Sequence, residues 1–464
     1  MKLPNHKTLF PQEVVISMDL NTTPLHRAFW HYTLPSMAAL LVSGTYQIVD
    51  GIFVGHFIGG DGLAGINLAW PWVGVLLAIG MMIGIGAGAQ ASISLGGREQ
   101  QTASRFIAQG LWLLLLIGMP LGWLLNHTSA GFLAFQGASG DAAANAQDYL
   151  NIMAPASPLI LASIALPFLA RNLGAPRLAT YAMLAGAISN ILLDALFIAW
   201  LGWGLSGAAL ATVLAESLSV IICLVFLFSH RSRAPLAIAT FALKPRAMLR
   251  LLGTGFSSML MYLYISFSVV LHNILLLKYG TALHVAAYSI AGYLMAFYYM
   301  AAEGVSGGMQ PLVSFYYGSG QIKRLKDTFV LACKIILGSG IILVISLLLV
   351  PGFFASVFIG DDEALLDVAQ WAIRLHLFAL FIDGFLVMTA SWFQSLGMGR
   401  KATFITMGNM LIQLPFLALL PWLIGLNGVW LAVPFSNICL SLFAIYLLRR
   451  EFKSFRNKYP SQHE

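Results

Sequence analysis

Twelve long apolar segments follow one another along this chain, and they restrict its fold more than any other feature. Each is about 20 residues or longer, the length that an α-helix needs to cross a bilayer, whereas the strands of a membrane β-barrel alternate over about 10 residues. We therefore expect an all-α polytopic membrane protein with twelve transmembrane helices, near residues 30–57, 64–94, 105–125, 148–172, 178–200, 204–229, 250–278, 284–316, 328–352, 366–395, 401–424 and 427–448.

Composition excludes a water-soluble alternative. Of the 464 residues, 59% are hydrophobic and only 9% are charged, so the chain lacks the polar residues that would cover a surface facing water. The sequence also shows no zinc-binding spacing, nucleophile elbow or phosphate-binding loop, and we expect neither an enzyme nor a resident cofactor.

The basic residues are distributed unevenly among the loops. Nearly all of the 25 Lys and Arg residues, Arg171 and Arg177 among them, fall in the two tails or in the loops after every second helix, whereas acids such as Asp141 lie in the opposite loops. By the positive-inside rule, both termini and the basic loops are predicted to be cytoplasmic. The net charge of +7 therefore reflects topology, and we expect the lipid bilayer, not nucleic acid, as the surrounding partner.

The second half of the sequence repeats the first. Six helices per repeat is an even number, so both halves cross the membrane in the same direction, and a two-fold axis along the membrane normal relates them. Parallel repeats with a site at their interface are a recurring plan of transporters. Three pairs of segments match at separations of 220 to 223 residues: Gly84–Ser94 with Gly304–Ser314, Leu173–Tyr181 with Leu396–Phe404, and Gly204–Ala211 with Gly425–Ala432.

The repeat and the loop charges together predict how the chain is divided. We expect a central cavity between two six-helix lobes that are joined by a basic linker. The predicted parts are a cytoplasmic tail over 1–29, an N-lobe over 30–229, a cytoplasmic linker over 230–249, a C-lobe over 250–449 and a cytoplasmic tail over 450–464.

Four polar residues of the first half are predicted to lie at a similar depth in the membrane. At 1.5 Å per residue, Asp50, Asn190, Asp194 and Thr212 lie about 9 to 15 Å below the same membrane face. Asn190 and Asp194 are four residues apart and share a helical face. Carboxylate, amide and hydroxyl oxygens suit Na⁺, and two carboxylates in one dry pocket also suit a proton. The alternative is a set of hydrogen bonds that only holds three helices together.

Five further titratable residues within the expected helices are candidates for a second protonation site or for contact with a substrate. A charge that faces lipid is costly, so such acids usually face the interior of the bundle. Glu303 and Asp383 are predicted to lie toward the cytoplasmic half, where the alternative is hydrogen bonding near neighbouring glycines. The full set is Glu216, Glu303, Asp383, His272 and His376.

These residues together resemble the multidrug and toxic-compound extrusion (MATE) transporters, in particular their DinF-like and MepA-like bacterial branch. The resemblance covers residues 30–450 and is carried by Val49–Gly55, Asn190-x3-Asp194, Thr212, Gln310-Pro311 and both Leu-Gly-x-x-Arg blocks. It implies a cation site at Asp50, Asn190, Asp194 and Thr212, and a bend of the first helix at Pro35. The helix 7 glutamate of the NorM-like branch has no counterpart here, while Asp383 lies where that branch keeps a helix 10 acid.

The resemblance and the buried acids predict a secondary active antiporter. We expect it to export small amphipathic, cationic organic compounds in exchange for Na⁺ or H⁺, by rocking one lobe against the other, as a monomer in the bacterial inner membrane. A flippase of lipid-linked saccharides, from the same superfamily, would need a larger and more cationic cavity. An integral-membrane polyprenyl-phosphate transferase would need clustered acids for Mg²⁺ at a cytoplasmic helix end.

Overall fold

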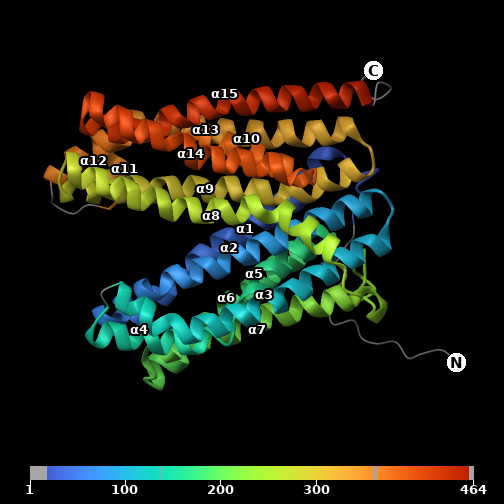
Figure 1. Cartoon of the computed structure of the whole chain (residues 1–464), viewed down its shortest axis with the longest axis horizontal. Coiled ribbons are helices and arrows are strands. Elements are labelled where there is room, and N and C mark those ends of the chain that lie inside the picture. Colours follow the sequence, from blue (N-terminus) through green and yellow to red (C-terminus); the bar gives the residue numbers. More distant parts are fainter. Residues whose placement is uncertain (1–17, 137, 359–362, 459–464) are drawn as a thin grey trace.

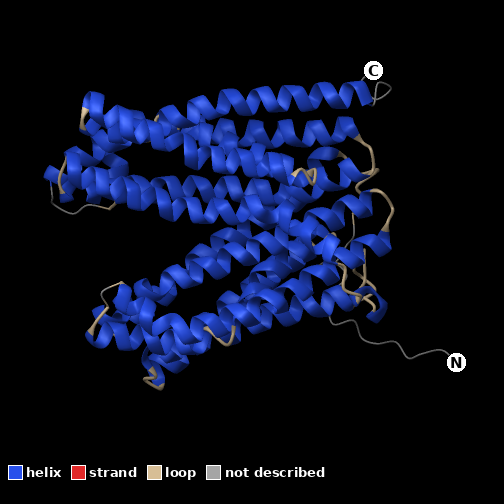
Figure 2. Cartoon of the chain, viewed as in Figure 1, coloured by secondary structure: helices blue, strands red, loops and turns tan. Residues whose placement is uncertain are grey.

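The computed structural model describes residues 18–136, 138–358 and 363–458. Short loops join the helices of this part of the chain, and Figure 2 shows no strand among them. Ten of the described helices are long and apolar enough to cross a membrane alone, and two bent helix pairs bring the number of spans to twelve. The predicted all-α, twelve-span fold is confirmed.

The first half consists of α1 (Leu25–Phe57), α2 (Gly60–Gly96), α3 (Gln100–Phe135), α4 (Gly140–Met153), α5 (Ser157–Asn172), α6 (Pro176–Asp194), the π-helical turn η2 (Ala195–Trp200) and α7 (Gly204–Phe228). The second half consists of the 3-10 turn η3 (Ile238–Phe241), α8 (Pro245–Tyr279), α9 (Ala282–Gly318), α10 (Ile322–Leu349), α11 (Pro351–Ser356), α12 (Glu363–His376), α13 (Leu380–Ser395), α14 (Gly399–Ile424) and α15 (Leu426–Lys458). Residues 1–17 and 459–464 of the predicted tails lie outside the described residues.

Two of the expected helices are not continuous. The segment predicted over 148–172 is the pair α4 and α5, bent by 68°, and the segment over 366–395 is the pair α12 and α13, bent by 48°. Pro155 lies in the first break, where a proline lacks the backbone N–H that would continue α4. The second break, between His376 and Leu380, contains no proline.

The two halves cross each other in equivalent ways, as the repeat predicts. Helix α2 packs on α8, where Gly86 faces the backbone of Leu251. Helix α9, which corresponds to α2 in the second half, packs on α1, where Gly308 faces the backbone of Thr33. Glycines at these positions let the helix backbones approach closely.

A pair of hydrogen bonds shows the same symmetry. The Ser92 hydroxyl donates to the carbonyl oxygen of Asn172 at 3.1 Å. At the equivalent place in the second half, the Ser314 hydroxyl donates to the carbonyl oxygen of Ser395 at 2.7 Å.

The two bundles converge at one end of the molecule and diverge at the other (Figure 1). At the convergent end, Gly96 of α2 faces the backbone of Phe315 of α9, and Gly318 of α9 faces the backbone of Ile93 of α2. This end carries basic loops, including the one between α2 and α3 with Arg98. Tight packing there closes one end of the space between the halves.

Helix α1 contributes to the cores of both halves. Its early residues Phe29 and Tyr32 are buried in the cluster formed mainly by α9, α10 and α13, whereas Val54 near its end is buried in the cluster of the first half. Pro35 lies inside the continuous helix, and its carbonyl oxygen accepts a hydrogen bond of 2.7 Å from the Thr180 hydroxyl. Any movement between the halves therefore acts directly on α1.

Candidate cation site and central cavity

The structure brings the two aspartates of the first half together. Asp50 lies on α1, and Asp194 is the last residue of α6, a helix that packs along α1. Their carboxyl groups are close enough to interact with each other. Asp194 is 0% exposed, and Asp50 is partly buried. Two acidic side chains from distant parts of the sequence thus share one pocket.

Asn190 and Thr212 complete this pocket. The Asn190 amide nitrogen lies 3.5 Å from the Thr212 hydroxyl oxygen, the long limit of a hydrogen bond, and the Thr212 hydroxyl donates to the carbonyl oxygen of Ala208 at 3.0 Å. Asn190 is 2% exposed. The four residues predicted from their depth therefore gather at the contact of α1, α6 and α7.

Several oxygen atoms in this pocket are buried without a donor. Within the described residues, Oδ1 of Asp50, both carboxylate oxygens of Asp194 and Oδ1 of Asn190 have no hydrogen-bond partner. Buried polar atoms normally have a partner, so unpaired acceptors gathered at one place can accept a cation or a proton. The donor set consists of hard oxygen atoms, which fits Na⁺ as well as H⁺.

The backbone changes its winding directly after Asp194. Residues Ala195–Trp200 form a π-helical turn, in which the N–H of Leu201 donates to the carbonyl oxygen of Leu196 at 2.9 Å. Such turns are rare and frequently occur at functional sites. Here the wider turn begins at the residue that carries the buried carboxylate.

Glu216 extends the polar pocket toward the centre of the protein. It lies four residues after Thr212 on the same face of α7, and its Oε2 atom is buried with no partner among the described residues. Tyr46 and Tyr149 both lie within electrostatic range of Glu216 and of Asp50. Both tyrosines therefore lie near Glu216 as well as near the aspartate pair.

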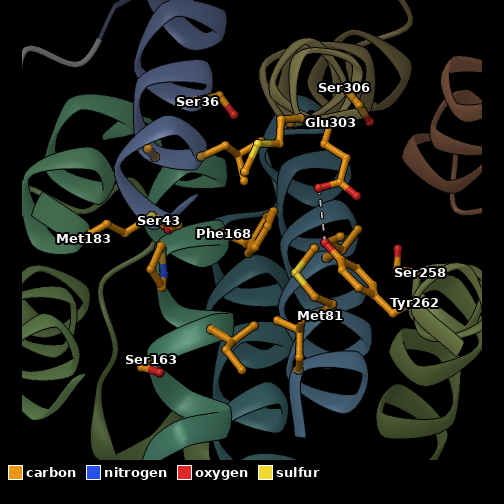
Figure 3. Close-up of a pocket in the computed structure, with 18 of the residues that line it drawn as sticks. Ser36, Ser43, Met81, Ser163, Phe168, Met183, Ser258, Tyr262, Glu303 and Ser306 are labelled. Atoms are coloured by element: carbon orange, nitrogen blue, oxygen red, sulfur yellow. Dashed lines mark hydrogen bonds between the residues drawn. The ribbon is translucent and has the colours of Figure 1, made fainter. Parts of the chain in front are cut away.

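A central cavity of about 360 Å³ lies between the two halves. Helices α1, α2, α5, α6 and α7 line it from one side, and α8, α9, α13 and α14 line it from the other. Asn190, Thr212 and Glu216 are among the lining residues, so the polar pocket borders the cavity. Figure 3 shows methionine, phenylalanine and serine side chains around this space. Methionine and aromatic surfaces adapt to ligands of different shape.

Glu303 brings a carboxylate into the cavity from the second half. Its Oε2 atom accepts a hydrogen bond of 3.3 Å from the hydroxyl of Tyr262, which Figure 3 shows as a dashed line. Glu303 lies on α9 and Tyr262 on α8, and both line the cavity. The cavity is thus bordered by one glutamate from each half.

Asp383 is separate from this space. The Tyr299 hydroxyl donates to its Oδ2 atom at 3.0 Å, and the Asn437 amide donates to its Oδ1 atom. Asp383 is not among the residues that line the cavity. Glu303 and Asp383, which the sequence groups together, therefore lie in different surroundings.

His272 and His376 form a buried pair that also lies away from the cavity lining. Their ring centroids are 5.5 Å apart. The Nδ1 atom of His272 donates to the carbonyl oxygen of Ser268 at 2.8 Å, and that of His376 to the carbonyl oxygen of Trp430 at 2.9 Å. Both rings are thus fixed by the backbone.

Arg171 is the cavity residue that sequence reasoning placed wrongly. It was expected in a cytoplasmic loop, but it lies in the last turn of α5, is 4% exposed and lines the cavity. A basic residue near the end of a transmembrane segment has the same sequence signal whether its side chain reaches water or turns inward. The side of the helix on which the residue lies decides between these two cases, and the sequence alone does not give it.

A twelve-span helical protein with two like-oriented repeats and buried carboxylates beside a shared cavity has the architecture of a secondary carrier. The family model described as MatE matches residues 35–196 and 257–419, once in each half, and the chain belongs to this family. The predicted membership is confirmed: the chain is a multi-pass membrane transporter of the multidrug efflux family and not an enzyme.

Two relatives resemble the chain over nearly its full length. The multidrug export protein MepA of Staphylococcus aureus (strain MRSA252) is 26% identical over 436 residues, which cover 92% of this chain and 95% of the relative. MepA of Staphylococcus haemolyticus (strain JCSC1435) is 25% identical over 431 residues, which cover 92% and 94%.

Solved structures share the fold. A MATE protein crystallised in the bent conformation has a TM-score of 0.89 and 23% identity, and the match covers 95% of this chain and 98% of that one. An outward-facing multidrug resistance MATE family transporter of the MOP superfamily has a TM-score of 0.88 and 23% identity, with 95% and 99% covered.

Proposed function

We propose that this transporter is an antiporter that exports amphipathic, cationic organic compounds in exchange for Na⁺ or H⁺. The observation that carries the proposal is the set of unpartnered buried oxygens of Asp50, Asn190 and Asp194 beside a cavity that Glu216 and Glu303 line. The names of the staphylococcal relatives, which describe multidrug export, support this substrate class. The proposal includes a monomer in the bacterial inner membrane with both termini in the cytoplasm.

The coupling follows from the charge of the aspartate pair. Two carboxylates in a desolvated pocket repel each other, and a bound cation or proton removes this repulsion and favours closer packing of α1, α6 and α7. Helix α1 is also part of the core of the second half, through Phe29 and Tyr32, so a change in its packing alters the fit of the two halves. Ion and substrate then share one conformational equilibrium.

An imposed ion gradient tests the exchange directly. Purified protein in liposomes is given either an inward Na⁺ gradient at equal pH or an inward H⁺ gradient without Na⁺, and ethidium efflux is followed by fluorescence. We expect one of the two gradients to accelerate efflux about tenfold or more over the gradient-free rate, within the usual range of coupling between sites. Dissipating the gradient with an ionophore is the control. Ethidium efflux that neither gradient changes would refute antiport.

Glu303 is the candidate anchor for a positive group of the substrate. The Glu303→Gln variant keeps the size of the side chain and its contact with Tyr262 but removes the charge. We expect its KM for ethidium to rise about tenfold, because a cation–carboxylate contact away from bulk water is worth about 1.4 kcal/mol or more. Glu363→Gln, at the exposed start of α12, is the matched control. Equal KM values for both variants would contradict this role.

The composition of the cavity favours an exporter over the two alternatives. Among the described residues that line the cavity, Arg171 is the single basic side chain and two are glutamates, whereas a lipid-linked saccharide flippase needs a more cationic cavity. The described residues also contain no group of three or more His, Cys, Asp or Glu that could hold a metal ion, so the acidic cluster of a polyprenyl-phosphate transferase is not found there.

A further inference from the structure

Arg171 reaches from the first half of the protein to the second. Its side chain leaves α5 and stacks over the ring of Phe168, with 5.0 Å between the guanidinium carbon and the ring centroid. A Cβ atom placed on Gly307 of α9 would lie only 2.8 Å from its Nη1 atom. Because Gly307 has no side chain, the guanidinium group can occupy this position between the two halves.

The positive charge of Arg171 has no counter-charge within the part of the chain that the structure describes. Among the described residues it forms no ion pair and no side-chain hydrogen bond, and its Nε atom is buried without an acceptor. A buried charge without a partner is costly, so residues of this kind are retained for a ligand or an ion.

The equivalent position in the second half is Gln394, which lies 223 residues later. Its amide nitrogen donates to the carbonyl oxygen of Thr254 at 3.0 Å and to the hydroxyl of Ser258 at 2.8 Å. The amide nitrogen of Gln394 therefore has hydrogen-bond partners within the protein, whereas the guanidinium group of Arg171 at the related position has none among the described residues and faces the cavity.

Glu303 forms no ion pair with Arg171. Glu303 is four residues before Gly307 on α9, which separates these positions by about 6 Å along the helix axis. The Glu303 carboxylate accepts its hydrogen bond from Tyr262. Phe168, Met81 and Met300 line the same cavity. The cavity thus offers a positive group, an apolar surface and a negative group in one space.

We propose that Arg171 binds the carboxylate of zwitterionic substrates whose ammonium group lies at Glu303. This inference rests on the proposed export function and narrows its substrate class to include amphipathic molecules that carry both charges. A guanidinium group can bind a carboxylate through two parallel hydrogen bonds, and Phe168 and the methionines contact the apolar body. An analogue without the carboxylate leaves the buried guanidinium group unpaired. The site therefore favours the zwitterionic substrate over that analogue.

The test compares three substrates that differ in charge. Norfloxacin carries a carboxylate and an ammonium group, its methyl ester keeps only the ammonium group, and ethidium is a permanent cation. Transport by purified protein in liposomes is measured for the native chain and for Arg171→Gln. We expect the variant to lower kcat/KM for norfloxacin about tenfold or more, while the values for the ester and ethidium stay within about twofold. Arg177→Gln, an exposed residue at the start of α6, is the control and should leave all three unchanged.

Each other outcome has a definite meaning. Equal losses for all three substrates would show a purely structural role of Arg171 and overturn the inference, as would unchanged norfloxacin transport. If Arg171→Gln does not fold, Arg171→Lys keeps the charge but not the fork geometry, and its KM should rise for norfloxacin alone. Liposomes made only of phosphatidylcholine exclude an anionic lipid headgroup as the ligand, and a norfloxacin effect that disappears there would also overturn the inference.

The two proposals fail separately. A native chain that does not transport ethidium in response to any ion gradient contradicts the proposed antiport function. A native chain that does transport ethidium, combined with an Arg171→Gln variant that shows no selective loss of norfloxacin transport, contradicts only the assignment of Arg171.

Discussion

Replacing either Asp50 or Asp194 by asparagine is expected to lower ion-driven ethidium export about a hundredfold, toward the upper end of the coupling measured between binding sites. Asparagine keeps the size of the side chain but can neither carry the negative charge that attracts a cation nor release a proton. The remaining carboxylate then lacks the like charge whose repulsion the ion relieves. Ethidium accumulation in an efflux-deficient host at matched expression gives the readout.

The control for this pair is Asp61→Asn. Asp61 lies at the exposed start of α2, outside the polar pocket, and its replacement should leave ethidium resistance near the level of the unmodified protein. If Asp50→Asn and Asp194→Asn both retained full resistance, the buried oxygens would have no part in energy coupling.

Replacing Gly255 by valine is expected to abolish export and to lower the free energy of unfolding by about 1–3 kcal/mol, the usual cost of overpacking. A Cβ atom on Gly255 would meet the carbonyl oxygen of Met82 at a distance that real Cβ atoms do not show, and the branched side chain of valine adds two methyl groups. Helices α2 and α8 would have to move apart at a main contact between the two halves. Thermal unfolding of the purified protein in detergent, together with ethidium export, measures both effects.

Gly253→Val provides a matched comparison two residues earlier on the same helix. Gly253 is exposed, and no atom of the described residues lies within 4 Å of the Cβ position other than those of its own helix and neighbours. We expect this variant to unfold within a few degrees of the unmodified protein. Similar melting temperatures for the two valine variants would show that close packing at Gly255 does not hold the halves together.

The architecture could be predicted because it depends on properties that a sequence displays directly. The length of an apolar segment indicates a membrane span, and the repeated blocks indicated the symmetry that the bonds of Ser92 and Ser314 confirm. The bends were not predicted, because the apolar segments run through them without interruption. Pro155 marked the first bend, whereas nothing in the residues between His376 and Leu380 signals the second.

The meeting of the polar residues of the first half could be predicted for a similar reason. Depth along the membrane normal can be counted in residues, and that count brought Asp50 and Asp194 to one level. Rotation about the helix axis cannot be counted in this way. The side of the helix on which a residue lies determines that Glu303 lines the cavity and Asp383 does not. It also determines that the side chain of Arg171 points inward. These distinctions depend on how neighbouring helices pack.

The unequal pair formed by Arg171 and Gln394 has a consequence for how such transporters diversify. If the two halves descend from one duplicated six-helix unit, both positions began with the same residue. A substitution in one half then gave the lining of the central cavity its positive charge at this position. Homologues that exchange arginine and glutamine at this position should therefore differ in the charge of the molecules they carry while they keep the same overall architecture.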